Sequence, residues 1–303
     1  MAQVFRCTLK TGETVELFNP QKYTRFHADP KSEELARKTI EFFEQKGLTK
    51  IKEDDQAAVW YDDFLDFVKK EQIFAHFLTP KKYSNLNGRW DMYRISEFNE
   101  ILGFYGLCYW YAWQVTILGL GPIWMGENEE VKEKTAKFLE EGGIFAFGLS
   151  EKTHGADLYS SEMTLTPDGK GAYRAKGSKY YIGNGNCASF VSTFARMDTT
   201  GEYVFFVVDP EHEKYECVKK IDTSGVRQAY VAEYALHDYP IQEKDILSKG
   251  EHAWNSSLNT INVGKFELGC ASIGIASHCF YEALNHAAGR NLYGRWVTDF
   301  PHV

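Results

Sequence analysis

The sequence lacks the patterns that mark several large classes of protein. It contains no C-x-x-C pair, no G-x-S-x-G, no H-E-x-x-H and no Walker A loop. The motifs of many zinc sites, serine hydrolases, zinc proteases and P-loop nucleotide hydrolases are therefore absent. We expect the cysteines to be free thiols in a reducing compartment, and we expect no bound metal. The six cysteines are Cys7, Cys108, Cys187, Cys217, Cys270 and Cys279.

The sequence also lacks an excess of basic residues and a targeting signal. The net charge of -8 argues against non-specific binding to nucleic acid, which requires basic patches. The N-terminus has no apolar signal core, and the acidic Glu13 and Glu16 do not suit a transit peptide. We therefore expect a cytoplasmic protein. Its 303 residues are enough for two or three domains.

Charged residues are missing from one long stretch, Ile101–Gly126. Its 26 residues are enough to span a bilayer as a helix. Several glycines, Gln114 and Pro122 interrupt the apolar pattern, and glutamates rather than basic residues flank it. The stretch therefore predicts a buried core helix over residues 101–118, ended by the segment Gly119–Pro122, and no integral membrane span.

Helix signals dominate the chain before residue 143. Asp29 and Pro30 predict the start of a helix, and Gly47 predicts its end. A second helix is expected to open at Asp54-Asp55. An amphipathic helix is predicted over residues 128–139, closed by two glycines.

From residue 144 the pattern changes to short strands separated by turns. Strands are predicted near residues 144–149, 160–166, 172–182, 188–196, 203–208, 215–221 and 228–236. Short strands at this spacing suggest a small barrel or a sandwich. From about Ser257 the pattern is helical again and rich in small residues, which a helix tolerates where another helix or a flat ligand comes close.

Two strand ends between residues 144 and 186 carry the candidate site. Phe145 and Phe147 alternate along the first strand, which runs into a polar turn. The second strand ends in Tyr180-Tyr181-Ile182 and turns at Asn184-Gly185. Aromatic strand ends that open into glycine-containing loops suit a flat ring, with apolar walls for its faces and backbone N–H groups for its edge. An ordinary hairpin with exposed loops has the same pattern, so both interpretations stay open at this point.

Four segments in order resemble the acyl-CoA dehydrogenase family. The first pair is A-F-G-L-S-E-x-x-x-G-A-D and G-S-K-Y-Y-I-G-N-G, similar to the family's flavin-binding A-x-T-E-P-x-A-G-S-D and G-x-K-x-W-I-T-N-G. Residues 121–142 resemble the family's preceding helix. Residues 271–276, with Arg290–Gly294 downstream, resemble the first long helix of its C-terminal domain. The resemblance covers roughly residues 95–303.

This resemblance implies an α+β multidomain fold. Residues 1–143 would form an N-terminal all-α domain, residues 144–250 a central β-barrel, and residues 251–303 the first helix of a truncated C-terminal helical bundle. The implied reaction, typical of fatty acid β-oxidation, converts an acyl-CoA thioester to the 2,3-enoyl-CoA with hydride transfer to FAD. The implied partners are an electron-transfer flavoprotein and further copies of the chain, as a homodimer or homotetramer. A flavin-dependent oxidase or monooxygenase of the same fold, and a catalytically inactive partner subunit, remain alternatives.

The resemblance also assigns residues to the site. The flavin would be bound by Phe147, Leu149, Ser150, Ala156, Tyr181, Ile182, Gly183, Arg290 and Tyr293, with Arg290 reaching the FAD of a neighbouring subunit. The acyl-CoA path would be bordered by Ala156, Asn262 and Lys265. Lys265 stands where the family often has Arg, and a cation suits the anionic CoA.

Several positions depart from the family pattern. Lys152-Thr153-His154 replaces a proline-containing turn, which places His154 beside the expected flavin. Ala156 replaces a common serine, Gly183 a common Thr or Ser, and Pro301 a common glutamine. Each change removes a side-chain hydrogen bond, which contributes only about 0.5–1.5 kcal/mol, so we expect flavin binding to survive.

The catalytic base is the largest departure. A minority of the family carries the base glutamate on the long helix, at the position of Gly264, which cannot act as a base. Glu267 is three residues further along and is expected to point elsewhere. We therefore expect the base glutamate to lie beyond Val303, in a part of the family's C-terminal domain that this sequence lacks.

Overall fold

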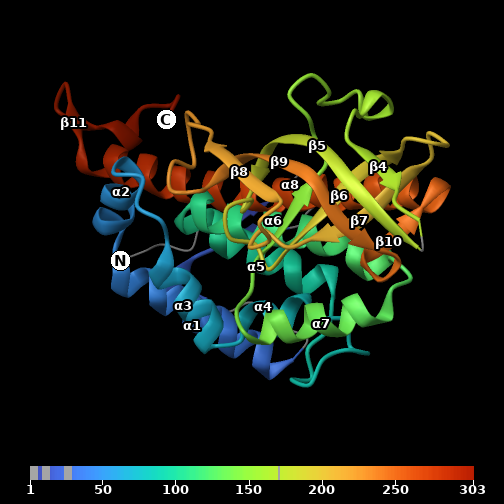
Figure 1. Ribbon diagram of the computed structural model, residues 1–303. Coiled ribbons are helices and arrows are strands. Elements are labelled where there is room, and N and C mark those ends of the chain that lie inside the picture. The colour runs from blue at the N-terminus through green and yellow to red at the C-terminus, as the bar shows by residue number, and fades with distance from the viewer. Residues whose placement is uncertain (1–5, 9–13, 24–28, 170) are drawn as a thin grey trace.

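The chain changes from helix to sheet and back to helix along its length (Figure 1). The computed structural model describes residues 6–8, 14–23, 29–169 and 171–303. The side chains of Cys7, Glu13 and Glu16 lie outside the described part, so the expectations that rest on them are not tested. The other five cysteines are free thiols, as predicted.

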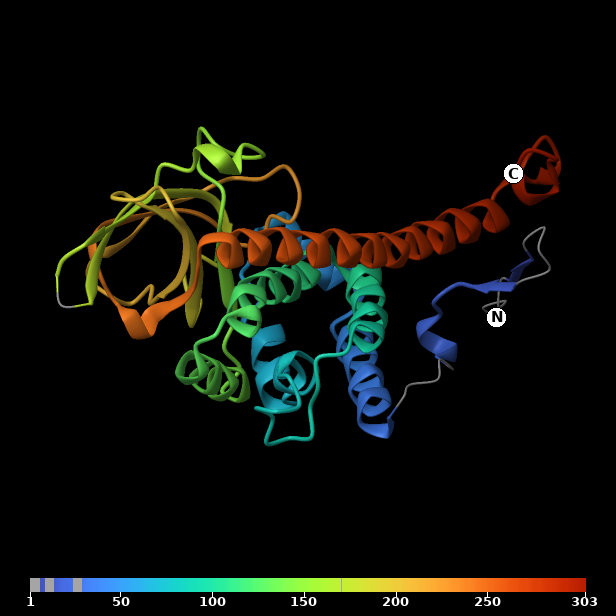
Figure 2. The ribbon, with the colours of Figure 1, turned by 90° about the vertical axis from the view of Figure 1, so that its right-hand side faces the viewer.

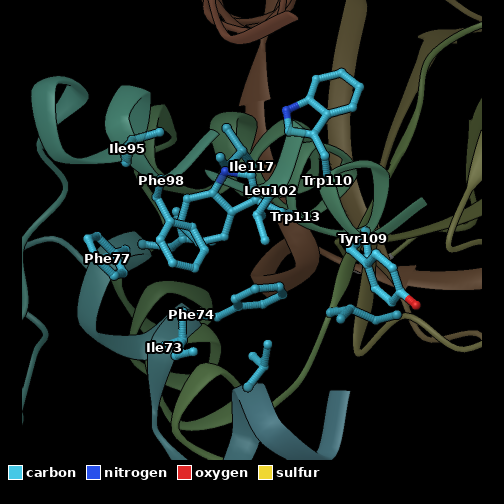
Figure 3. Close-up of a cluster of buried hydrophobic side chains, with 14 of the residues drawn as sticks. Ile73, Phe74, Phe77, Ile95, Phe98, Leu102, Tyr109, Trp110, Trp113 and Ile117 are labelled. Atoms are coloured by element: carbon cyan, nitrogen blue, oxygen red, sulfur yellow. The ribbon is translucent and has the colours of Figure 1, made fainter. Parts of the chain in front are cut away.

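The N-terminal part is built of helices around an aromatic core. A hairpin of β1 (Arg6–Thr8) and β2 (Thr14–Glu16) and the short helix η1 (Pro20–Lys22) come first. The helices are α1 (Pro30–Lys46), α2 (Leu48–Gln56), α3 (Asp62–Lys70), α4 (Ile73–Leu78), α5 (Met92–Tyr105), α6 (Leu107–Met125) and α7 (Glu129–Glu140). In the core, Trp113 of α6 lies against Phe74 of α4 and Phe98 of α5, with ring centroids 5.2 and 4.8 Å away (Figure 3).

Local capping explains where the first helix begins and ends. The Asp29 side chain accepts the N–H of Ser32 at 2.8 Å. Gly47 ends α1 at a φ of 78°, a conformation that favours glycine. The prediction that Asp54-Asp55 opens a helix is wrong, because these residues lie in the last turn of α2. Asp54 is held there by Lys46 at 3.0 Å and Lys50 at 2.6 Å.

The charge-free stretch forms two helices rather than one. Gly106 separates α5 from α6, and α6 continues through Gly119, Gly121 and Pro122 to Met125, so the predicted end at Gly119 is wrong. These glycines serve packing instead. A Cβ at Gly119 would lie 2.7 Å from the backbone N of Ala146, and one at Gly121 would overlap Thr260. Within the described residues, no helix has both the length and the apolar character that a membrane span requires.

An eight-stranded sheet follows the helices. Its strands are β3 (Phe145–Gly148), β4 (Thr164–Pro167), β5 (Ala172–Gly183), β6 (Phe190–Met197), β7 (Tyr203–Val208), β8 (Tyr215–Lys220), β9 (Val231–Gln242) and β10 (Ile246–Lys249). The order is β10-β7-β6-β4-β5-β9-β8, and β3 pairs with β6 in parallel. Each predicted strand overlaps an observed one, and β10 was not predicted. The short helices η2 (Leu158–Ser160) and η3 (Glu243–Asp245) lie in its connections.

The sheet curls strongly but is not the closed barrel that was expected (Figure 2). In the described part of the chain, its end strands β10 and β8 do not pair with each other. Register shifts between β5 and β9, at 175–177 and 180–182, add local bends, which is the usual effect of a β-bulge. The fold class itself, helices before and after a central sheet, is confirmed.

One long helix, α8 (Gly250–Gly289), leaves the sheet and lies across α5 and α6 (Figure 2). Small residues permit the contact: a Cβ at Gly274 would overlap the carbonyl oxygen of Glu100, and one at Gly103 would overlap Ala271. The other side of α8 is open, with Phe266, Ile273 and Phe280 each 45–55% exposed. A hairpin of β11 (Asn291–Leu292) and β12 (Arg295–Trp296) and the short helix η4 (Val297–Asp299) follow.

Candidate functional site

A buried ion pair joins the two segments of the candidate site. Lys179 of β5 is fully buried, and its Nζ lies 2.8 Å from Glu151 Oε1 and 3.0 Å from the carbonyl oxygen of Leu149. Glu151 also accepts the hydroxyl of Ser161 and the backbone N–H groups of Glu162 and Met163. The loop that follows β3 is therefore fastened to β5 from the inside.

Both members of this pair have shifted pKa values. Burial lowers the pKa of Lys179 to about 8, although Glu151 opposes the shift. Burial acts to raise the pKa of Glu151, but the charge of Lys179 and the hydrogen bonds outweigh it and hold the pKa below its ordinary value. At neutral pH we assign both charges as present, because a buried carboxylate with this many donors is strongly stabilised.

A second set of contacts fixes the same loop at its outer side. The hydroxyl of Ser150 donates to the carbonyl oxygen of Tyr180 at 2.7 Å, and the Tyr180 N–H donates back to the carbonyl of Ser150 at 2.9 Å. Tyr181 has a φ of 69° at the register shift, which turns its side chain outward to 54% exposure. Ile182, in contrast, is buried. The structure therefore fastens Ser150 to Tyr180, the residue directly before Tyr181.

Gly183 closes the site against helix α6. A Cβ built on Gly183 would lie 2.7 Å from the ring edge and the hydroxyl oxygen of Tyr111, and 2.7 Å from Val115. The neighbouring Asn184 is buried and donates to the carbonyl oxygen of Phe145 at 3.1 Å. Tyr111 thus occupies the space that a side chain at position 183 would fill.

The inner wall of the first segment is apolar. Phe147 is half-buried and stacks on Phe205 of β7 with ring centroids 5.9 Å apart. Leu149 is half-buried too, and both pack against the helical core. These two residues border the site on the side of the sheet.

The turn after β3 offers unused backbone donors. In the part of the chain that the structure describes, the N–H groups of Gly155, Ala156 and Asp157 donate to no acceptor. Ala156 is exposed, and nothing lies within 4 Å of a Cβ built on Gly155. Free N–H groups in a turn form an anion-binding concavity.

His154 lies between two carboxylates in this turn, 3.5 Å from Asp157 and 3.4 Å from Glu162. One ligand atom each from Glu151, His154 and Glu162 lies within 4.8 Å of the others. Glu151 is already bound by Lys179 and three further donors, so this cluster does not indicate a metal site.

The α8 residues divide between the two sides of the helix. Asn262 and Lys265 are exposed, whereas Gly264 faces α6 and accepts the side-chain amide of Gln114 at 3.1 Å. Glu267 is fully buried, and neither of its carboxylate oxygens has a hydrogen-bond partner among the described residues. Burial raises its pKa well above the ordinary value. It is therefore enclosed in the helical core and is not a base open to substrate.

The residues at the C-terminal end are not brought to the site of the same chain. Arg290 follows the end of α8, about 38 Å from Lys265 along the helix at 1.5 Å a residue. Tyr293 is 95% exposed, and Arg290 and Pro301 are exposed as well. Figure 2 shows this end projecting away from the sheet.

Sequence reasoning missed the contribution of α6. Tyr111, Gln114 and Val115 line the site from a stretch that was interpreted only as a buried core helix. The available signal was a tyrosine and a glutamine within a run without charges, since buried polar groups usually have a specific partner.

Comparison with known proteins relates the sheet to one family of domains. Residues 146–239 match the family described as "Acyl-CoA dehydrogenase, middle domain". The short-chain specific acyl-CoA dehydrogenase of Megasphaera elsdenii is 26% identical over 186 residues, 60% of this chain and 49% of that protein. The caffeyl-CoA reductase-Etf complex subunit CarC of Acetobacterium woodii is 24% identical over 277 residues, 89% of this chain and 72% of that protein.

A solved structure extends the similarity to the whole fold. Butyryl-CoA dehydrogenase from Megasphaera elsdenii has a TM-score of 0.83 at 22% identity, and covers 92% of this chain and 74% of that one. The fold is that of the acyl-CoA dehydrogenases. The chain is related to this family, and its sheet carries the family's middle domain. The chain spans about half the length, 40–49%, of the first curated relatives it matches.

Proposed function

We propose that the protein is an FAD-dependent acyl-CoA dehydrogenase that oxidises an acyl-CoA thioester to the 2,3-enoyl-CoA. The observation that carries the proposal is the pair of segments fastened by Glu151 and Lys179, within a matched middle domain. When bound, FAD would supply the acceptor for the hydride that leaves the substrate.

The residues present fit such a cofactor. A flavin needs apolar walls, a polar edge and donors for its diphosphate. Phe147 and Leu149 would supply the walls, supported from behind by the buried Ile182, with Tyr181, Ser150 and Gly183 at the edge of the ring. The three free N–H groups of residues 155–157, including that of Ala156, would donate to the phosphates.

The proposed substrate path runs between this turn and α8. Asn262 and Lys265 are exposed on that helix, and Lys265 would attract the phosphates of CoA. The α-proton of the substrate requires a base. Since Gly264 has no side chain and Glu267 is buried, we place the base on a glutamate beyond Val303.

The proposed assembly has more than one copy of the chain. Arg290 and Tyr293 lie beyond the end of α8 that projects away from the sheet, whereas Ser150 and Tyr181 lie at the sheet. We therefore infer that Arg290 and Tyr293 reach the FAD of a neighbouring subunit in a homodimer or homotetramer. An electron-transfer flavoprotein is the proposed electron acceptor, because the similar CarC protein is named as a subunit of an Etf complex.

The first test is FAD binding by the purified protein. We expect flavin absorbance bands after purification or reconstitution, and a higher melting temperature with excess FAD. A folded protein that stays colourless and gains no thermal stability would contradict the proposal.

The second test separates the reaction types. A flavin-loaded protein that includes the proposed base glutamate beyond Val303, given acyl-CoA without oxygen, should bleach and form the 2,3-enoyl-CoA, whereas residues 1–303 alone should give only residual turnover. Product formation that requires oxygen would favour an oxidase or monooxygenase, and flavin binding without reduction by any acyl-CoA would favour an inactive partner subunit.

A further inference from the structure

The contact between Tyr111 and Gly183 joins residues that lie far apart in the sequence. Tyr111 stands in the middle of α6, and Gly183 is the last residue of β5. The ring edge and hydroxyl of Tyr111 each lie 2.7 Å from where a Cβ on Gly183 would be. That distance is too short for two unbonded atoms, so the tyrosine and any side chain at position 183 exclude each other.

The hydroxyl of Tyr111 is available for a hydrogen bond. It contacts no donor or acceptor in the described part of the chain, although the side chain is half-buried. Half-buried tyrosine hydroxyls usually find a partner. The hydroxyl lies 2.7 Å from the Cβ position of Gly183, the residue at the proposed flavin edge, so it stands beside that edge.

The electrostatic setting keeps this hydroxyl a donor. Burial, with a smaller contribution from Tyr181, raises the pKa of Tyr111 to about 12. The phenol therefore stays protonated throughout the physiological range. Flavin rings carry several acceptor atoms along their polar edge, and a donor of this kind matches them.

We propose that Tyr111 supplies from helix α6 the hydroxyl that contacts the flavin edge beside Gly183, and that position 183 is glycine because this tyrosine needs the space. The inference rests on the proposed FAD site. It makes Tyr111 a cofactor-positioning residue and explains why the chain dispenses with a Thr or Ser at position 183.

The first experiment removes only the hydroxyl. Tyr111→Phe should bind FAD about 2- to 12-fold more weakly, the factor that corresponds to one ordinary hydrogen bond. The melting temperature of the FAD-free protein should not change, because the hydroxyl has no partner among the residues that the structure describes. A donor to the ring stabilises the reduced form, so the midpoint potential should fall, by about 30 mV for each tenfold change in relative affinity.

The matched control is Tyr173→Phe. This hydroxyl donates to Glu243 at 2.8 Å and belongs to the same strand as Gly183, roughly 30 Å away at 3.3 Å a residue. Its loss should leave FAD affinity and midpoint potential unchanged.

A reciprocal pair tests the shared space. Gly183→Thr alone should weaken FAD binding and lower the melting temperature. Tyr111→Ala combined with Gly183→Thr should recover part of the FAD affinity and part of the melting temperature. The alanine leaves room for the threonine side chain, and the threonine restores a hydroxyl group. Such recovery is a coupling that independent sites do not show.

The outcomes separate this inference from the proposed function. If the unmodified protein does not bind FAD, the proposed function and the role of Tyr111 are both refuted. If it binds FAD, but Tyr111→Phe matches it within twofold in affinity and has the same midpoint potential and visible spectrum, the role of Tyr111 is refuted and the FAD site stands. An effect of Tyr111→Phe confined to the KM for acyl-CoA would also refute it, since the hydroxyl would then contact substrate instead.

Discussion

Replacing Lys179 with methionine should destabilise the sheet and disassemble the candidate site. The methionine keeps most of the length and volume of the lysine side chain but removes its charge and its bonds to Glu151 and Leu149. Glu151 would remain buried and ionised with its partner gone. Loss of one member of a buried ion pair typically costs about 3–5 kcal/mol.

The assay is unfolding in urea at pH 7, followed by circular dichroism and tyrosine fluorescence. Lys176→Met is the matched control, because Lys176 is an exposed lysine of the same strand and should change the free energy of unfolding by less than about 0.5 kcal/mol. The double variant Lys179→Met/Glu151→Gln should lose less than the two single variants together, since it leaves no unpaired charge.

The pH dependence follows from the lowered pKa of Glu151. A depressed native pKa adds stability that is present above the ordinary value of 4.5 and is lost as the pH falls through the native value. The gap between the unmodified protein and Glu151→Gln should therefore narrow below pH 4.5. If Lys179→Met is as stable as Lys176→Met at pH 7, the pair does not hold the loop and the account of the site is wrong.

Three further predictions concern other positions. Gly183→Ala should lower the melting temperature, because its methyl group would overlap the ring from α6, whereas Gly155→Ala, with open space around it, should not. Glu267→Leu should raise the free energy of unfolding at neutral pH, measured by urea titration. Because the native pKa of Glu267 is raised, proton binding to this residue stabilises the native state of the unmodified protein at low pH. The gain in stability from the substitution should therefore grow as the pH rises above 4.5. Ile273→Lys with Phe280→Lys should reduce self-association in sedimentation without lowering the melting temperature, because both side chains are exposed on α8; unchanged association would show that this face is not involved.

Local chemistry made much of the secondary structure predictable. The start of α1 follows from Asp29, whose carboxylate accepts the N–H of Ser32 in the first turn of the helix. The end of α1 follows from Gly47. The predicted strand 203–208 is β7 without any shift, because a short continuous run of apolar residues between two turns determines it. The two loops of the candidate site were predicted for the same reason, since a strand end and a glycine-containing turn are both local features.

Tertiary packing decided what local patterns left open. Gly119 and Gly121 resemble helix stops in the sequence, yet α6 passes through them because β3 and α8 press closely against its surface. Closure of a barrel depends on whether the first and last strands meet, and in this sheet β10 and β8 do not.

By itself, the sequence determined the order of helices and strands and the two loops of the candidate site. Only the tertiary structure showed that Tyr111 fills the place of a side chain at Gly183, that Glu267 is sealed in the helical core, and that Arg290 lies far from the site of its own chain. The physical reason is the distance along the sequence over which each interaction acts. Caps, turns and alternation act between residues a few positions apart, whereas a shared volume is set by elements that meet only after the chain has folded.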